Sequence, residues 1–396
     1  MDKQETTKKM AFIDYVPHII FILLLGLVTF LLYYNEIHYI GKQQFIREAE
    51  GAVTILEEAP AVDAALDGKL IYASAFADTK ETLTDELYGV SEKALLLNRK
   101  VEYYQYKEHY RKGKGDREGY YYYRTDWYPY QIDSQQFEES GHNNFALVKI
   151  PQKPVYADVR FGGYRLPEFI LGAIGGDVPA EVKLSGDKLQ QWENVVANNI
   201  QVLRLPVSGG APMVHVNGNV VYYGKSPSKP SVGDVRVTLT KIEPCQISFI
   251  AKVSGSTFEK YTDENGKIFS SVKRGTVTAV EMFSEAHADI MLWLWGLRLI
   301  LLILSMLIWR AMFSVLPDIF KSAFLDRLIK AGFKAFRRVM GFVWACLVIG
   351  IAWIQYSSTV SIAALVLAVA GIWYLNGKGK KAEIENEKQK FKIGNS

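Results

Sequence analysis

One uncharged stretch near the N-terminus, IIFILLLGLVTFLLY at residues 19–33, decides the fold. Three more apolar runs crowd the last quarter of the chain, at residues 290–313, 339–356 and 357–375. A bilayer core of about 30 Å needs roughly 20 mostly apolar residues per helix. We therefore predict an integral membrane protein with four transmembrane α-helices, the first of them at residues 14–34.

Basic residues are concentrated in three short segments outside the predicted spans: the tail 1–13, the connection 314–338 and the tail 376–396. Basic residues in short loops mark the cytoplasmic side of a membrane. This pattern predicts that all three segments are cytoplasmic and that the long domain 35–289 is extracytoplasmic. The first run lacks a small-x-small cleavage pattern after it, so we expect an uncleaved anchor.

The connection 314–338 has the pattern of a basic amphipathic helix. Its apolar positions, such as Leu325, Leu328 and Ile329, fall on one helical face. Its basic positions fall largely on the other face, and four of them are candidate contacts to the membrane surface: Lys330, Lys334, Arg337 and Arg338. Such a helix is suited to lying on an anionic cytoplasmic leaflet.

The domain 35–289 is predicted to be β-rich, with an α+β character. Alternating apolar and polar residues recur in eight runs: 69–74, 94–107, 120–124, 145–150, 214–223, 234–242, 246–253 and 267–272. Asp67–Gly68, Asn217–Gly218 and Asn265–Gly266 are hairpin signals beside such runs. A helical pattern is predicted at residues 186–198, with Ser185 as its N-cap.

Two stretches of this domain are alike, beginning at Gly68 and at Gly218. Each reads as a turn, a strand, a linker and a long alternating run. An internally duplicated β unit would explain this similarity. The alternative is that any two β-meanders look similar at this level.

Several blocks of the chain resemble the LUMA (transmembrane protein forty-three) family. They are Leu95–Tyr106, then Trp127 with Ile132–Ser134, Phe137 and Gly141–Asn144, then Gly233–Val237, and Glu281–Phe283 before the second span. Tyr103 and Tyr106 depart from the family's usual Met and Trp, and Phe145 replaces a Pro. The resemblance implies a four-span protein of the endoplasmic reticulum or nuclear envelope that organises membrane protein complexes. It attaches no catalytic residues, and bacterial relatives exist.

Composition narrows the class and the compartment. Cys245 and Cys346 lie in different predicted parts of the chain, which excludes a disulfide framework. The predicted outer domain has no Asn-x-Ser/Thr sequon. That absence favours a bacterial inner membrane, where the domain would be periplasmic. The endoplasmic reticulum or nuclear envelope is the expectation for a eukaryotic source.

A tyrosine-rich block is the candidate contact surface. Its named members are Arg111, Lys112, Tyr120, Tyr122, Trp127 and Tyr128. Tyr and Trp supply large contact area and are enriched at interfaces. The alternative is that these residues pair across strands and are half buried. Four consecutive tyrosines, residues 120–123, must alternate between the two faces of a strand.

Two further candidates concern single polar residues. Arg298 lies within the second apolar run, and an intramembrane charge is a functional hypothesis by default. It is also near Trp293 and Trp295, so it could reach the headgroups or pair inside the bundle. His142 near Asp133 is the remaining candidate for a catalytic site, although a lone His is more often structural.

The favoured function is a membrane-anchored scaffold that organises membrane protein complexes. Its expected partners are the lipid bilayer, further copies of itself and other membrane proteins, with no nucleic acid. We expect no catalytic residues, cofactor or metal, since no catalytic or nucleotide-binding motif occurs. The alternatives are a channel or transporter component built around Arg298, and an extracytoplasmic hydrolase or ligand-binding protein built around His142 and Asp133.

Overall fold

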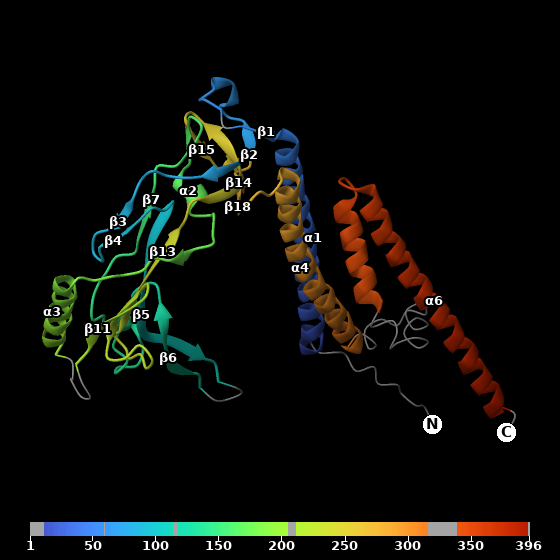
Figure 1. Ribbon diagram of the computed structural model, residues 1–396. Helices are drawn as coiled ribbons and strands as arrows, with labels where there is room; N and C mark the ends of the chain where they lie inside the picture. The colour runs from blue at the N-terminus through green and yellow to red at the C-terminus, as the bar shows by residue number, and fades with distance from the viewer. Residues whose placement is uncertain (1–11, 59, 114–117, 205–210, 316–338, 395–396) are drawn as a thin grey trace. The chain divides into compact units, whose positions relative to one another are not determined.

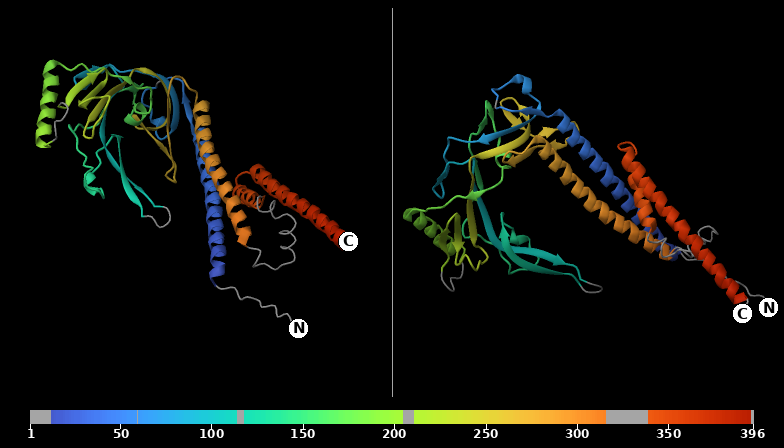
Figure 2. Two further views of the ribbon diagram at one scale, coloured as in Figure 1. Left: turned by 90° about the horizontal axis from the view of Figure 1, so that it is seen from below. Right: turned by 45° about the vertical axis from the view of Figure 1, so that its right-hand side comes forward.

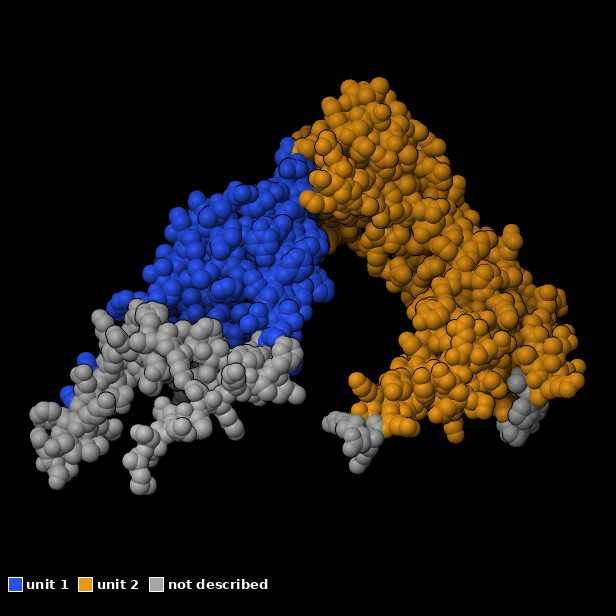
Figure 3. Space-filling view, turned by 180° about the vertical axis from the view of Figure 1, so that it is seen from behind, with its two compact units in different colours: residues 1–51, 283–396 blue, residues 52–282 orange. Residues whose placement is uncertain are grey.

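The computed structural model describes residues 12–58, 60–113, 118–204, 211–315 and 339–394 (Figure 1). The chain forms two compact units, drawn in different colours in Figure 3. One unit contains residues 1–51 and 283–396, and the other contains residues 52–282. The first is helical and the second is β-rich, as the apolar runs and the alternating runs predict.

The helical unit contains the predicted apolar helices. They are α1 (Phe12–Ala52), α4 (Ala279–Val315), the helix Val339–Trp353 and α6 (Ser358–Gly394). By length and composition, α1, α4 and α6 each contain a segment able to cross a bilayer, whereas the helix Val339–Trp353 is shorter. The chain is therefore a membrane protein with three long apolar helices and a shorter one. The predicted basic helix 314–338, with Lys330, Lys334, Arg337 and Arg338, lies almost wholly outside the described residues.

Small residues let the helix Val339–Trp353 approach α4 closely. The Ser305 hydroxyl of α4 donates a hydrogen bond to the Gly341 carbonyl at 3.2 Å. A Cβ atom on Gly341 would lie 2.4 Å from the Met306 Cα, so only glycine fits there without a shift. Close backbone approach at small residues is a common way for membrane helices to associate. An apolar cluster continues this packing to α1, with Leu32, Leu301 and Ala345 fully or nearly buried.

The β unit is organised around two sheets of seven strands each (Figures 1 and 2). The first sheet has the order β1 (Thr54–Leu56), β2 (Leu70–Ala77), β14 (Cys245–Ser254), β15 (Thr257–Glu259), β9 (Tyr164–Arg165) and β8 (Arg160–Phe161), and β18 (Ser271–Arg274) also pairs with β14. The second sheet has the order β11 (Met213–Asn217), β12 (Val220–Gly224), β13 (Val235–Ile242), β5 (Leu96–Arg111) and β6 (Tyr120–Tyr128), with β10 (Val178–Pro179) on β13 and β7 (Lys153–Tyr156) on β5.

Smaller elements complete the unit. They are the pairs β3 (Leu83–Asp85) with β4 (Val90–Glu92) and β16 (Tyr261–Thr262) with β17 (Ile268–Phe269), the helices α2 (Glu168–Leu171) and α3 (Gly186–Val202), and the 3-10 turns Ala64–Leu66 and Ser134–Gln136. Ser185 caps α3 as predicted, because its side chain accepts a hydrogen bond from the Lys188 amide.

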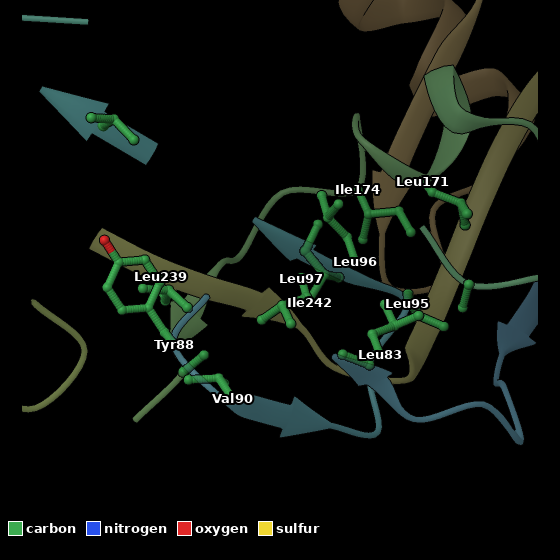
Figure 4. Close-up of a cluster of buried hydrophobic side chains, with 14 of the residues drawn as sticks. Leu83, Tyr88, Val90, Leu95, Leu96, Leu97, Leu171, Ile174, Leu239 and Ile242 are labelled. Carbon is green, nitrogen blue, oxygen red and sulfur yellow. The ribbon is translucent and has the colours of Figure 1, made fainter. Parts of the chain in front are cut away.

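One continuous core joins the two sheets, because β13 leads into β14 through a two-residue turn. Figure 4 shows part of this core, with Leu96 and Leu239 among its members. The Tyr88 hydroxyl bonds the Tyr223 hydroxyl at 3.0 Å, and burial raises the pKa of both phenols. Buried polar groups of this kind are tolerated because each has a partner.

A buried ion pair also lies in this unit. Both carboxylate oxygens of Asp85 accept hydrogen bonds from Arg99 Nη1 at 2.9 Å. Arg99 Nε donates further to the Pro151 carbonyl at 3.1 Å. Because both charged side chains are almost inaccessible, the pair is compensated internally rather than by water.

Two of the three predicted hairpin turns are confirmed, and one is wrong. Asn217–Gly218 joins β11 to β12, and Asn265–Gly266 lies between β16 and β17. Asp67–Gly68 does not join two antiparallel strands, since a 3-10 turn precedes β2 and β1 pairs with β2 in parallel. The Gly68 amide instead donates to the Val253 carbonyl, which docks the turn on β14.

The predicted strand at residues 145–150 is also wrong. Most of its apolar side chains are buried and Phe145 is half-buried, but the backbone is irregular. The Leu147 amide donates to the Gly233 carbonyl, and the Leu147 carbonyl accepts from the Asn199 side chain. The two similar stretches do not form equivalent units either. β2 pairs with β14 in the first sheet, whereas β12 lies in the second sheet between β11 and β13.

Candidate functional site

A buried carboxylate in the helical unit receives three hydrogen bonds from two other helices. Glu36 of α1 is fully buried. Arg298 of α4 donates through Nε to Glu36 Oε1 at 2.9 Å and through Nη2 to Glu36 Oε2. Trp353 donates through Nε1 to Glu36 Oε2 at 2.7 Å. This two-pronged geometry is the strong form of an arginine–carboxylate pair.

The remaining surroundings of Arg298 are aromatic. Its guanidinium lies 4.7 Å from the centroid of the Trp295 ring, and its side chain is 13% exposed. Tyr39 packs against Trp353, with ring centroids 5.8 Å apart. Of the two sequence alternatives for Arg298, the structure therefore places it in a pair inside the bundle.

A second polar group lies further along the same two helices. The Gln43 side chain of α1 donates to the His287 carbonyl of α4 at 3.2 Å and also bonds the His287 ring at Nδ1. The other ring nitrogen of His287 lies 3.5 Å from a carboxylate oxygen of Glu50. Together with the Glu36 pair, these contacts fix the antiparallel register of α1 and α4.

Sequence reasoning missed Glu36, although a signal for it was present. Glu36 follows the first apolar run within three residues, and Arg298 carries the opposite charge inside the second run. A carboxylate at the end of one predicted span and an arginine inside another are a reason to expect pairing. Their separation by 262 positions hides this pairing from local pattern reading.

In the β unit, β5 and β6 form a long hairpin that continues beyond the end of β13 (Figure 2). The ladder between β13 and β5 ends where Val235 faces Tyr103, whereas the ladder between β5 and β6 continues to Arg111 opposite Tyr120. Residues beyond Tyr103 therefore belong to a projecting two-stranded ribbon.

One face of this ribbon, here called the basic aromatic face, combines cations with aromatic rings. Its members are Lys107, His109, Arg111, Tyr120, Tyr122, Arg124 and Tyr128, and Asp126 is the one acidic residue of β5 and β6 on the same face of the ribbon. His109 stacks on Tyr122 with centroids 5.2 Å apart, and Arg124 lies 5.5 Å from the same ring. The alternation of the four tyrosines is thus confirmed, because Tyr120 and Tyr122 share this face while Tyr121 and Tyr123 point to the other.

The opposite face of the ribbon is acidic. Glu108 accepts hydrogen bonds from the Tyr123 hydroxyl at 2.6 Å and from the Glu138 amide at 2.7 Å. The pKa of Tyr121 on this face is raised, first by desolvation and then by the negative charges of Glu138 and Glu108. The cations of the ribbon therefore lie on the first face, where they outnumber the single carboxylate of Asp126, and Glu108 lies on the opposite face.

The predicted contact residues do not all lie together. Arg111, Tyr120, Tyr122 and Tyr128 lie on the basic aromatic face, and Lys112 follows Arg111 at the end of β5. Trp127 lies on the opposite face, where the Arg236 guanidinium is 4.4 Å from its ring centroid. Tyr104 and Tyr222 pack edge-on against the same indole, so Trp127 is a packing residue.

His142 and Asp133 do not form a catalytic pair in this structure. Asp133 accepts from the Gln135 amide and from the Gln136 side chain. His142 stacks on Tyr123, with ring centroids 3.7 Å apart, and its Nδ1 has no hydrogen-bond partner among the described residues. Within the same described parts of the chain, no three His, Cys, Asp or Glu side chains gather as a metal site.

Asn144, two residues later, has a clear structural role. Its side-chain amide accepts from the Tyr106 amide at 2.8 Å and donates to the Tyr106 carbonyl at 3.0 Å. It thereby replaces a neighbouring strand at the edge of β5, just past the end of β13. This explains why the Gly-His-Asn-Asn block is tied to the tyrosine-rich strand.

These features define the class: a membrane protein whose helical unit is held by an internal ion pair and is joined to a large β unit. A family model described as Transmembrane protein 43 matches residues 101–358. The chain belongs to the Transmembrane protein 43 family, as the resembling blocks predict.

Curated relatives support the family assignment over most of the chain. The chain is 25% identical to Transmembrane protein 43 of Rattus norvegicus over 84% of this chain and 83% of the relative. It is 23% identical to that of Homo sapiens over 89% of each chain, and 27% identical to the Drosophila melanogaster homolog over 69% of this chain and 72% of the relative. No solved structure matches. These animal relatives do not support a bacterial inner membrane, and they are compatible with the endoplasmic reticulum or nuclear envelope.

Proposed function

We propose that this protein is a non-enzymatic scaffold that organises membrane protein complexes through the projecting ribbon of its β unit. The observation that carries the proposal is the basic aromatic face. Aromatic and arginine side chains dominate the energetics of protein interfaces, and a field of one sign steers partners of the other sign. The partner that fits is a membrane protein with an acidic segment.

In the proposed topology the chain crosses the membrane four times. Both tails and the segment 314–338 are cytoplasmic, and the β unit is extracytoplasmic. The distribution of basic residues supports this arrangement. The helical bundle supplies anchoring and self-association, and we propose a homo-oligomer in which copies pack through these helices.

The channel alternative receives less support from the helical unit. The charge of Arg298 is offset by the buried Glu36 carboxylate, and both oxygens of that carboxylate are already bonded. An ion path needs polar groups that are available to the ion. Ion flux in liposomes that changes on Arg298→Ala would reverse this preference.

The scaffold proposal is tested by cross-linked purification from native membranes. The wild-type chain is compared with the double charge reversal Lys107→Glu and Arg124→Glu on the basic aromatic face. Lys153→Glu on β7, an exposed lysine elsewhere in the same sheet, is the matched control. We expect defined membrane protein partners with the wild type and the control, and their loss with the double reversal.

Two results would count against the proposal. One is a wild-type preparation that is monomeric and free of partners after cross-linking. The other is an unchanged set of partners after charge reversal, which would remove the basic aromatic face from the interaction.

A further inference from the structure

A cavity of ≈ 290 Å³ lies in the seam between α1 and α4. Its lining comes from one face of each helix: Asn35, His38, Tyr39 and Lys42 on α1, and Asp289, Ile290, Trp293, Leu294 and Leu297 on α4. Residues three and four positions apart lie on one face of a helix, so one continuous face of each helix lines the cavity. The volume is just below the range of about 300–1,000 Å³ that is typical of small-molecule sites.

On α4 the lining changes from charged to apolar along the seam, whereas the lining residues of α1 are polar throughout. α1 and α4 are antiparallel, because Glu36 meets Arg298 and Gln43 meets His287. Lys42 and Asp289 therefore lie at one end of the cavity, and Asn35 and Leu297 lie at the other. From Lys42 to Asn35 is seven residues, or about 10 Å along a helix.

The cavity lies between the predicted end of the first apolar run and the predicted start of the second. The first apolar run ends at Tyr33, just before Asn35, and the second begins at Ile290, just after Asp289. Charged residues at the ends of spans lie at headgroup level, and Trp is enriched there. Trp293 is 76% exposed in the helical unit, as expected of a side chain that faces lipid.

Three polar side chains of the lining, Lys42, Asp289 and Asn35, have groups without a protein hydrogen-bond partner among the described residues. Lys42 and Asp289 carry opposite charges, yet neither forms a hydrogen bond or ion pair within the described residues. The Asn35 side-chain nitrogen is buried and has no hydrogen-bond partner among those residues either. A buried donor without a partner costs free energy unless a ligand or water supplies an acceptor.

We propose that this cavity binds the headgroup of one zwitterionic phospholipid. Lys42 pairs with the phosphate, and Asp289 accepts hydrogen bonds from the ammonium group. Asn35, two turns deeper, donates to an ester carbonyl of the glycerol backbone. The acyl chains then run past Trp293 and Leu297 into the bilayer. This site is independent of the proposed scaffold role and of the ribbon that carries it.

The amine of the headgroup decides the lipid class. Lys42 alone would favour any anionic lipid through its charge. Asp289 at the same level repels a purely anionic headgroup and attracts a cation. Phosphatidylethanolamine, whose primary ammonium donates hydrogen bonds, fits both groups. Phosphatidylglycerol carries the phosphate but lacks the amine.

The test is native mass spectrometry of the full-length, detergent-solubilised protein. The probes are phosphatidylethanolamine, phosphatidylglycerol and diacylglycerol, with soluble glycerophosphoethanolamine as the competitor. We expect one phosphatidylethanolamine per chain. Lys42→Ala and Asp289→Asn each weaken its binding about tenfold, the effect of one charge-assisted hydrogen bond. Asp289→Asn also removes the preference over phosphatidylglycerol.

Arg47→Ala is the matched control, since Arg47 is an exposed cation on α1 outside the cavity lining. Melting temperatures in lipid-free detergent verify that each variant is folded. If Lys42→Ala is not folded, Lys42→Gln is used in its place. Equal retention of phosphatidylethanolamine by wild type, Lys42→Ala and Asp289→Asn would overturn the proposal. So would diacylglycerol binding as tightly as phosphatidylethanolamine. If glycerophosphoethanolamine displaced phosphatidylethanolamine at an equal concentration, the site would recognise the soluble headgroup compound and not the membrane lipid.

Discussion

Glu36 of α1 and Arg298 of α4 form a paired, hydrogen-bonded contact across 262 positions of the chain. Burying two charges is costly, and the cost is offset only when the geometry satisfies both groups. Here Trp353 provides the third donor to the carboxylate. Glu36, Arg298 and Trp353 therefore connect three helices of the helical unit at one level.

The first prediction concerns this pair. Arg298→Ala leaves a buried carboxylate without its counter-charge, so the free energy of unfolding falls by about 3–5 kcal/mol. The measurement is denaturant titration of the detergent-solubilised protein, followed by tryptophan fluorescence. Glu36→Leu combined with Arg298→Leu should cost less than the sum of the two single changes. Arg310→Ala on the exposed part of α4 is the control, and a loss of the same size there would remove the special role of the pair.

The second prediction concerns close helix packing. Gly341→Ala places a methyl group 2.4 Å from the Met306 Cα, so the two helices must separate. We expect a loss of about 1–3 kcal/mol, as for overpacked sites. Gly296→Ala on α4 is the matched control, because its new methyl group meets nothing within 4 Å. Thermal melting of both variants side by side checks this. Equal melting temperatures would mean that the glycine is not needed for the approach.

The third prediction concerns pH and Asp234. Burial raises the pKa of this carboxyl, against the lowering effect of hydrogen bonds from Tyr222 and Ser231. The folded state therefore binds the proton more tightly than the unfolded chain does. The stabilisation that this tighter proton binding gives the folded state is complete below the ordinary pKa of about 3.9. This stabilisation is lost as the pH rises through the raised pKa.

Asp234→Asn should remove this pH dependence. Relative to the Asn variant, the wild type should lose stability as the pH rises from about 4 through the raised pKa of Asp234, at about 1.4 kcal/mol per unit of pKa difference. Denaturant titrations at several pH values measure the difference. Asp177→Asn in an exposed loop is the control. A difference that stays constant across this pH window would show that Asp234 does not gain a proton preference on folding.

The fourth prediction concerns Asn144, whose side chain takes the place of a neighbouring strand at the edge of β5. Asn144→Ala removes both hydrogen bonds to the Tyr106 backbone. Faster hydrogen exchange of the Tyr106 amide should follow, with a loss of about 1–3 kcal/mol for the unpaired groups. Exchange followed by mass spectrometry reads this segment directly. The neighbouring exposed residue supplies the control: Asn143→Ala should leave the exchange of Tyr106 unchanged.

The sequence alone determined the properties that depend on local pattern. Length and hydropathy of the apolar runs predicted a membrane protein, since a bilayer sets the minimum length of a span. Alternation predicted that the tyrosines 120–123 divide between two faces, because a strand repeats every two residues. The cap at Ser185 and the turn at Asn217–Gly218 also depend only on neighbouring residues.

Only the tertiary structure decided which distant groups meet. The antiparallel register of α1 and α4 brings Glu36 to Arg298, and it leaves Lys42 and Asp289 at one end of the cavity without a hydrogen bond or ion pair to any residue that the structure describes. The end of β13 leaves an open edge on β5 that Asn144 fills. Each of these contacts depends on how one helix or strand is aligned with its neighbour. That alignment is set by the packing of the whole unit. Local sequence contains the groups, while the fold determines their partners.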